Sequence, residues 1–270
     1  MASHTVPTRY VYNVLWTGGW DSTFRVLQVL TENPDAVVQP HYLVDPCRST
    51  TGIEMKTIHR ITQACDQTTI YSRRIRPLVK VSVNDLLADK EIEQSWQAIR
   101  NHHAIGVQYK WLAQYAKHAA INDLEIGIQK GGHIDSLIGE NMVRKPAPGS
   151  HTYVINEGTA RGPYYLFSFF EFPIIRKSKR DMINYAQARG FAEIMDMTWF
   201  CFWPLGGIHP CGFCNPCNSA FRQGMKHRIG WRGLLLGVPA GLVYRKLPTR
   251  LQHSLRRIAR LTQSSPRPTP

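Results

Sequence analysis

The chain has 270 residues, 43% of them hydrophobic, which suits an α/β domain with a well-filled core plus a small appendage. This composition excludes an intrinsically disordered chain. The most apolar stretch, residues 233–243, has 11 residues and contains Pro239, whereas a membrane-spanning helix needs about 20 apolar residues. Residues 1–10 contain no apolar run of the kind found in signal peptides, so we expect a cytoplasmic protein without a transmembrane segment.

The net charge of +14 is distributed unevenly along the chain. Residues 197–270 contain eleven basic residues and no Asp or Glu, which leaves a charge of +3 on residues 1–196. We therefore expect three parts, which are an α/β domain over residues 1–196, a small cysteine-rich module over residues 197–226 and a basic extension over residues 227–270.

Near the start of the chain, an apolar run over residues 11–16 is followed by Thr17-Gly18-Gly19-Trp20-Asp21-Ser22-Thr23 and then by apolar residues at helical spacing. This order predicts a strand, a tight loop and a helix that begins near Ser22. Paired glycines let the backbone turn sharply and let amide groups approach an anion at the positive end of the helix. The candidate anion-binding residues are Thr17, Gly18, Gly19, Asp21, Ser22 and Thr23. The alternative is an ordinary turn in which Asp21 or Ser22 caps the helix.

The rest of the chain alternates short apolar runs with amphipathic patterns. The runs that predict strands are residues 37–45, 78–83, 124–128 and 170–175. The patterns that predict helices are residues 53–64, 106–120 and 179–189. Asn84 or Asp85 is expected to cap a further helical stretch, and Ser178 the helix at 179–189. Such alternation is typical of βαβ units, so the expected fold class is α/β: an open, mostly parallel twisted sheet with helices on both faces.

A different pattern lies between residues 129 and 172. Residues 129–150 are rich in Gly and Pro and are expected to form a long functional loop. Its carboxylates, Asp135 and Glu140, are interpreted either as metal or substrate ligands or as solvated side chains. Residues 151–156 and 164–172 are expected to pair as a hairpin.

Four of the six cysteines form two overlapping Cys-x2-Cys steps with one cysteine upstream, at Cys201, Cys211, Cys214 and Cys217. This spacing predicts tetrahedral thiolate coordination of Zn²⁺. Disulfides, which are disfavoured in the cytosol, and an iron–sulfur cluster are the alternatives. Because four thiolates complete the zinc shell, such a site is structural and not catalytic. Cys47 and Cys65 are isolated, and no role is expected for them.

The motif Thr-Gly-Gly-x-Asp-Ser directly after a strand resembles the PP-loop of ATP pyrophosphatases, which cleave ATP between its α and β phosphates. With Cys-x9-Cys-Gly-x-Cys-x2-Cys in the C-terminal part, the chain resembles one family in particular, the 7-cyano-7-deazaguanine synthases of the queuosine and deazapurine pathways. Two further segments are similar to that family, Asp45 with Arg48 and Glu54, and residues 172–179 with the pattern Pro-x5-Lys. Residues 104–108 and 131–140 depart from the family's substrate-side motifs.

The resemblance implies an adenine nucleotide alpha hydrolase-like fold that binds ATP and Mg²⁺. It implies that Asp21 orients Mg²⁺ and that Lys179 faces the leaving pyrophosphate; a solvated lysine at a helix start is the alternative for Lys179. Tyr42 and Val44, at the end of the second predicted strand, are expected to line the adenine slot, because ligands of open α/β sheets sit at the carboxyl ends of strands. The implied reaction adenylates 7-carboxy-7-deazaguanine or another carboxylate, which ammonia then converts to an amide and a nitrile.

The basic extension has no counterpart in the usual length of that family. Residues 247–261 carry an apolar stripe with arginines opposite it, which predicts a helix. Docking on the protein's own core or on a second copy in a homodimer, contact with nucleic-acid phosphates, and binding to a membrane surface all stay open for this helix. Two rival functions stay open as well, a PP-loop tRNA-modifying enzyme and a nucleotide-binding module without turnover.

Overall fold

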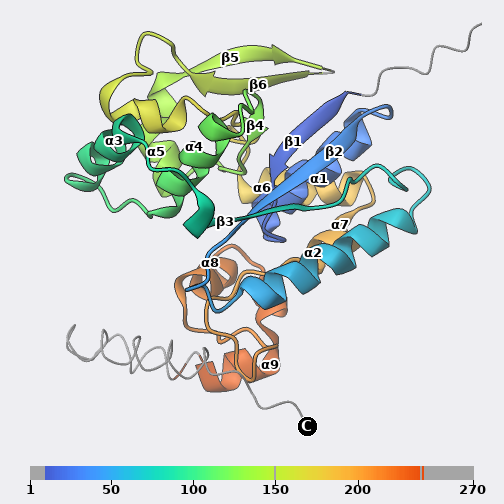
Figure 1. Cartoon of the computed structure of the whole chain (residues 1–270). Helices are drawn as coiled ribbons and strands as arrows, with labels where there is room; N and C mark the ends of the chain where they lie inside the picture. The colour runs from blue at the N-terminus through green and yellow to red at the C-terminus, as the bar shows by residue number, and fades with distance from the viewer. Residues whose placement is uncertain (1–9, 149, 238, 240–270) are drawn as a thin grey trace, which may run out of the picture.

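The computed structural model describes residues 10–148, 150–237 and 239 of the chain. A central sheet is surrounded by helices, and a small lobe that carries α8 and α9 lies below it (Figure 1). The helix predicted over residues 247–261, and most of the basic extension 227–270, lie outside the described residues.

Four strands form one sheet, with the order β3-β2-β1-β4 and parallel pairing throughout. They are β1 (Val11–Leu15), β2 (Val37–Val44), β3 (Val79–Ser82) and β4 (Leu124–Glu125). The predicted parallel α/β sheet is therefore confirmed. Strands β2 and β3 lie on one side of β1, whereas β4 lies on the other. A crevice is expected at the carboxyl ends of β1 and β4, where the direction of addition reverses.

Helices cover both faces of this sheet (Figure 1). The longer helices are α1 (Trp20–Glu32), α2 (Thr51–Asp66), α3 (Lys90–Arg100), α4 (Gln108–His118), α6 (Lys179–Ala188) and α8 (Asn215–Arg222). The shorter elements are α5 (His133–Ile138), α7 (Ala192–Asp196), α9 (Gly230–Arg232), η1 (Val83–Asp85), η2 (Gly139–Asn141), η3 (Gly162–Phe167), η4 (Lys226–Ile229) and η5 (Gly233–Gly237).

The core has two main parts, one on each face of the sheet. The predicted stripe of α1, at Phe24, Leu27 and Leu30, is buried in the first part together with residues of α2, α6 and α7. Helices α3, α4 and α5 and the 3-10 helix η3 form the second part, which buries Trp96 and Phe167. Apolar residues three and four positions apart lie on one face of a helix, so each stripe packs against the sheet.

The segment after β4 differs from the prediction. Residues 129–150 do not form a long loop, because they contain α5, η2 and most of a hairpin. This hairpin pairs β5 (Met142–Ala147) with β6 (Ser150–Ile155) in antiparallel register. The predicted pairing of residues 151–156 with 164–172 is therefore wrong. Pro163 explains part of the difference, because proline suits the first turn of a helix, here η3, and cannot donate a ladder hydrogen bond.

One of the two predicted helix caps is observed, and the other is made by a different residue. Ser178 caps α6 in a complete capping box, as predicted. Asp89 caps α3 by accepting a hydrogen bond from a first-turn amide, whereas Asn84 and Asp85 lie in η1. Residues 170–175, predicted as a strand, contribute a single bridge to β4.

A buried ion pair ties α1 to β4. Arg25 Nε and Nη2 donate to the two carboxylate oxygens of Glu125, each over 2.6 Å, and the two side chains are 8% and 2% exposed. Bidentate geometry satisfies both ions away from water. The pair therefore fixes the first helix relative to the fourth strand.

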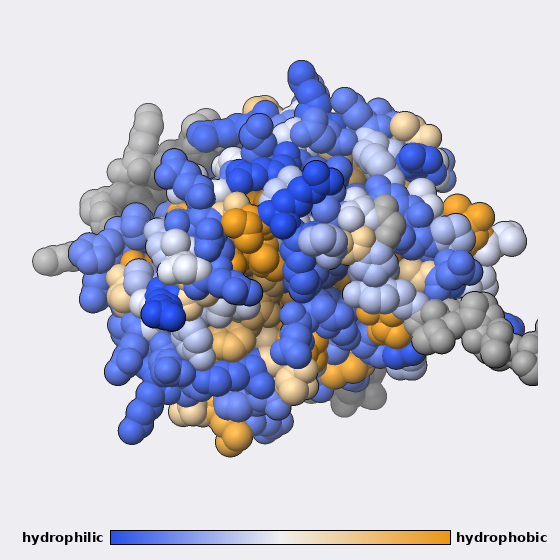
Figure 2. Space-filling view, turned by 90° about the horizontal axis from the view of Figure 1, so that it is seen from above, coloured by the Kyte–Doolittle hydropathy of each residue, from blue (hydrophilic) through white to orange (hydrophobic). Residues whose placement is uncertain are grey.

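Among the residues described, no helix has the length and apolar character needed to cross a membrane. Seen from above, on the side away from the lobe with α8 and α9, the surface is largely hydrophilic (Figure 2). Apolar residues line one furrow near the middle of that view, and smaller apolar patches lie elsewhere on this face (Figure 2).

Removal of one partner of the buried ion pair between Arg25 and Glu125 should destabilise the fold strongly. Glu125→Gln leaves the Arg25 guanidinium buried without its counter-ion, so the free energy of unfolding in urea should fall by about 3–5 kcal/mol. Glu93→Gln, which breaks the more exposed pair between Glu93 and Lys110 (2.8 Å), is the control and should cost about 1 kcal/mol or less. Equal losses of unfolding free energy in the two variants would show that the buried pair contributes no more to stability than the exposed pair.

Candidate functional site

The loop between β1 and α1 has the predicted order of strand, tight turn and helix. Gly18 has a φ of +69°, a left-handed conformation that favours glycine. Gly19 is the N-cap of α1, so no side chain caps this helix. The alternative in which Asp21 or Ser22 caps the helix is not the observed arrangement. The first amides of α1 are thus left without a side-chain cap, at the positive end of the helix dipole.

The loop is held by neighbours on two sides. A Cβ at Gly18 would lie 3.1 Å from Thr57 Cγ2 of α2, and the Gly18 carbonyl accepts a 2.9 Å hydrogen bond from the Trp199 amide. On the other side, a Cβ at Gly127 would lie 2.9 Å from the Ser22 nitrogen. Backbone atoms cannot move aside as a flexible side chain can. Glycine at position 127 is therefore required for the segment after β4 to meet the start of α1.

The first of two cavities at this loop has a volume of about 440 Å³. Its walls come from the carboxyl ends of the four strands, at Leu15, Leu43, Val83 and Ile126. Aromatic and polar residues that precede or begin α4 close it further. It occupies the place where an open parallel sheet binds ligands.

The second cavity has a volume of about 270 Å³ and separates the loop from the lobe that contains α8. Residues of the lobe and of α6 line it, among them Lys179, Phe200, Ser219 and Arg228. The two cavities share the residues Thr17, Gly19, Trp20, Asp21 and Arg48. A ligand that extends across the loop could therefore contact both.

Most of the site residues expected from the sequence line these cavities. Thr17, Gly19 and Asp21 line both, Ser22 and Tyr42 line the first, and Lys179 lines the second. Three others do not line either cavity, namely Gly18, Thr23 and Val44. Gly18 shapes the turn. Thr23 is fully buried and its hydroxyl accepts a 2.9 Å hydrogen bond from the Trp16 indole, while Val44 packs against the core beside α2.

Lys179 and Asp21 form an ion pair across the second cavity, although 158 residues separate them in the chain. The Lys179 side chain is 14% exposed, so it is not the solvated lysine of the alternative interpretation. Burial lowers the pKa of Lys179, the Asp21 carboxylate opposes this shift, and the charge of Arg228 adds to it. An anion bound here would relieve the repulsion between the two cations.

Arg48 enters both cavities from the segment after β2. Its guanidinium pairs with the buried carboxylate of Glu54 over 2.8 Å. Glu54 also accepts hydrogen bonds from the Tyr42 hydroxyl (2.8 Å) and the Thr50 hydroxyl (2.7 Å). This network holds Arg48 in one orientation at the boundary between the cavities. Burial, together with the nearby Glu54 carboxylate, raises the pKa of Tyr42.

Arg228 is a site residue that sequence reasoning missed. It lies in η4, and it lines the second cavity although it belongs to the segment assigned to the basic extension. In the sequence it is one of eleven basic residues after residue 196, and no spacing distinguishes it from the others. By contrast, Asp135 and Glu140 line neither cavity, and Asp135 instead accepts a hydrogen bond from the Gly131 amide.

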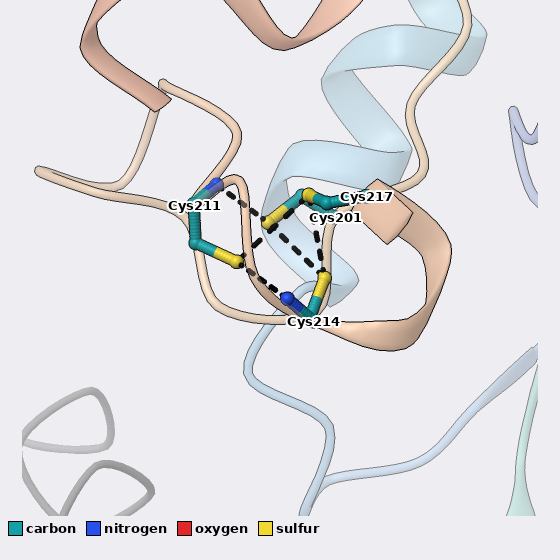
Figure 3. Close-up of side chains that lie close together, drawn as sticks. All are labelled: Cys201, Cys211, Cys214 and Cys217. Atoms are coloured by element: carbon teal, nitrogen blue, oxygen red, sulfur yellow. Dashed lines mark hydrogen bonds between the residues drawn. The ribbon is translucent and has the colours of Figure 1, made fainter. Parts of the chain in front are cut away.

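The four clustered cysteines converge as predicted. All are buried, and their sulfur atoms lie within 4.8 Å of one another. The sulfurs point toward a common centre, with Cys217 at the start of a helix and the others on loops (Figure 3). Neighbouring sulfurs are 3.4, 3.8 and 3.9 Å apart. A tetrahedron of thiolates about 2.3 Å from Zn²⁺ has sulfurs about 3.8 Å apart, so the donor set fits a metal ion.

The cluster depends on a glycine knuckle and on donated hydrogen bonds. Gly212 has a φ of +80°, and the amides of Cys211 and Cys214 donate to the sulfurs of Cys201 (3.1 Å) and Cys211 (3.3 Å). Amide donors stabilise the thiolate form that binds metals. All six cysteines are free in the structure, which contains no disulfide among them; Cys65 is buried outside the cluster, and Cys47 is exposed.

A comparison of the sequence with protein-family models and with curated proteins found no match.

Substitution of Gly127 by alanine tests whether the contact between the segment after β4 and α1 shapes the loop. The added methyl group must displace backbone atoms, so Gly127→Ala should lower the free energy of unfolding by about 1–3 kcal/mol. It should also increase hydrogen exchange at the first amides of α1. Gly52→Ala is the control, because a Cβ there meets open space within α2 and alanine favours a helix. Unchanged exchange in Gly127→Ala would contradict the proposed role of this contact.

Proposed function

We propose that this chain is a PP-loop adenylating ligase that cleaves ATP to AMP and pyrophosphate. The observation that carries the proposal is the position of the Thr17–Thr23 motif. Its glycines and an uncapped helix N-terminus lie at the carboxyl edge of a parallel sheet, between two cavities, with the partly buried Lys179 on one side. Helix N-termini of this kind bind phosphates. The strand order 3-2-1-4 also agrees with the nucleotide-binding fold that the resemblance implies.

The two cavities suggest how the nucleotide is divided. The first, with its apolar and aromatic walls, suits the adenosine, beside Tyr42 and Leu43. The triphosphate then crosses the loop toward the second cavity, where Lys179 neutralises the outer phosphates. Arg48, fixed by Glu54, stands at the boundary and suits the phosphate at which attack occurs. In such a reaction the protein contributes positioning and charge neutralisation, and little covalent chemistry.

Two metal ions belong to the proposal, with different roles. Asp21 offers a carboxylate at the loop, the ligand type that Mg²⁺ prefers, and Mg²⁺ would neutralise phosphate charge there. Cys201, Cys211, Cys214 and Cys217 would hold Zn²⁺ with a complete shell of thiolates, so the zinc would stabilise the lobe and take no part in the chemistry.

The acyl substrate is proposed from the resemblance to the 7-cyano-7-deazaguanine synthases. It is 7-carboxy-7-deazaguanine or another small carboxylate, with ammonia as the nitrogen source. Carboxylate oxygen attacks the α phosphorus, the bond to the β-phosphate oxygen breaks, and pyrophosphate leaves with the electron pair. Ammonia then displaces AMP to give the amide.

The test is pyrophosphate exchange into ATP, together with AMP release, screened against deazaguanine acids, other small carboxylates and bulk tRNA. AMP and pyrophosphate formed with a small acid would support the ligase. ADP and phosphate would reject attack at the α phosphorus. Exchange that requires tRNA would identify the tRNA-modifying alternative, and ATP binding without exchange would identify a module without turnover.

Lys179→Met should lower the rate of pyrophosphate exchange about 100-fold or more, because a buried cation on the outer phosphates is lost. Lys177→Met is the matched control, since Lys177 lies two residues away and does not line either cavity. The control should keep the wild-type rate. A similar rate in both variants would remove Lys179 from the phosphate site.

Zinc loading can be measured directly. Native mass spectrometry of the full chain should find one Zn²⁺, and Cys214→Ser should abolish it and lower Tm, because metal binding free energy contributes to folding. Cys47→Ser is the control, since Cys47 is exposed and outside the cluster. A Tm that does not change on complete removal of the metal would contradict the structural role.

A further inference from the structure

The second cavity is a junction between the loop and the lobe. Thr17, Gly19 and Asp21 line it on the loop side, and Ser219 and Gln223 of the lobe line it opposite. The first cavity, by contrast, has no lining residue from the part of the chain after residue 128. A ligand group in the second cavity would therefore contact the lobe, whereas a group in the first cavity would not.

The charges around this cavity leave one buried cation without a close carboxylate. Glu54 pairs with Arg48, and Asp21 pairs with Lys179. Arg228, with a side chain 4% exposed, has its Nε 3.9 Å from Asp196, a carboxylate that is 55% exposed and too distant for a hydrogen bond. Burial lowers the pKa of Arg228 to about 10. Burial of a charge without a close partner costs free energy, so an anionic ligand beside the Arg228 guanidinium would be stabilising.

The Arg228 guanidinium is held in a fixed orientation. Its Nη2 donates to the carbonyl oxygen (2.5 Å) and the hydroxyl (2.6 Å) of Thr198. The rings of Trp20 and Phe200 lie on it, each centroid 4.9 Å away. A preorganised guanidinium loses little freedom when it binds an oxyanion, and its planar fork matches phosphate geometry.

Buried polar atoms without a hydrogen-bond partner cluster around the second cavity. Among the described residues, four buried side-chain N or O atoms have no hydrogen-bond partner, and three of them belong to residues that line this cavity. They are Trp20 Nε1, Gln129 Oε1 and Arg228 Nε. Two of the three are N–H donors, as an oxyanion requires, and buried polar groups in native proteins ordinarily have partners.

We propose that Arg228 and Lys179 together form a two-cation site for the pyrophosphate end of the nucleotide, so that the cysteine lobe supplies half of the phosphate clamp. This inference rests on the proposed function for its place in the reaction. The electron pair of the broken α–β bridge leaves on a pyrophosphate oxygen, and the two cations neutralise the charge that develops there. The lobe thereby gains a role in ligand binding as well as in stability.

The same geometry makes pyrophosphate binding depend on the metal cluster. Thr198, which holds Arg228, and Trp199, which donates to the Gly18 carbonyl, precede the ligand Cys201 by two or three residues. Ala220 and Met225 of the lobe pack in the core against α1 and also line the cavity. Loss of order in the lobe would therefore displace Arg228 directly, whereas the first cavity has no lining residue from the lobe.

Isothermal titration of the zinc-loaded full chain with inorganic pyrophosphate, and separately with adenosine, tests the proposal. Arg228→Met should weaken pyrophosphate binding at least tenfold and leave adenosine binding within twofold of wild type. Arg222→Met is the matched control, because Arg222 is an exposed arginine of the same lobe, and it should bind both ligands as wild type does. Unchanged pyrophosphate affinity in a folded Arg228→Met variant would overturn the proposal.

A second variant covers the case in which Arg228→Met fails to fold. Ser219→Asp adds a carboxylate to the cavity wall without removing any contact of the guanidinium, and it should abolish pyrophosphate binding while adenosine still binds. Wild-type affinity for pyrophosphate in this variant would place the anion elsewhere. Arg228-dependent pyrophosphate binding without any exchange activity would keep this site and reject the ligase. Wild-type exchange in Arg228→Met would keep the ligase and reject this site.

Discussion

The close approach of the segment that follows β4 to the first turn of α1 is the constraint on which the rest of the site depends. Gly127 permits the contact, because any side chain there would meet backbone atoms of α1 at 2.9 Å. The buried pair between Arg25 and Glu125 then fixes the same helix to the same strand. Together they hold the uncapped N-terminus of α1 at the carboxyl edge of the sheet, where Gly19, Trp20 and Asp21 line both cavities.

This arrangement produces two cavities of different character. Apolar and aromatic walls at the strand ends suit a base, whereas the junction with the lobe gathers Lys179, Arg228 and Arg48. The charges in the second cavity are placed before any ligand arrives, which is how electrostatic stabilisation avoids reorganisation during a reaction. A triphosphate that crosses the loop would place its outer phosphates among these cations.

The cysteine lobe is more than an attached module. Its residues Ala220 and Met225 share a core with α1, and the Trp199 amide bonds to the Gly18 carbonyl. A metal ion at the four cysteines would therefore stabilise the wall of the second cavity as well as the lobe itself. The four-cysteine cluster and the glycine loop are therefore linked through shared packing and one backbone hydrogen bond.

The sequence by itself determined the parallel α/β sheet, the tight glycine loop and the convergence of four cysteines. Each depends on local chemistry: alternation of apolar patterns, the left-handed φ of Gly18 and Gly212, and ligand spacing along a short segment. Only the tertiary structure decided that Lys179 meets Asp21, that Gly127 abuts Ser22, that Arg228 joins the site, and that residues 142–155 form the hairpin. Periodicity specifies which face of an element is buried, but it carries no information on which distant elements that face will meet.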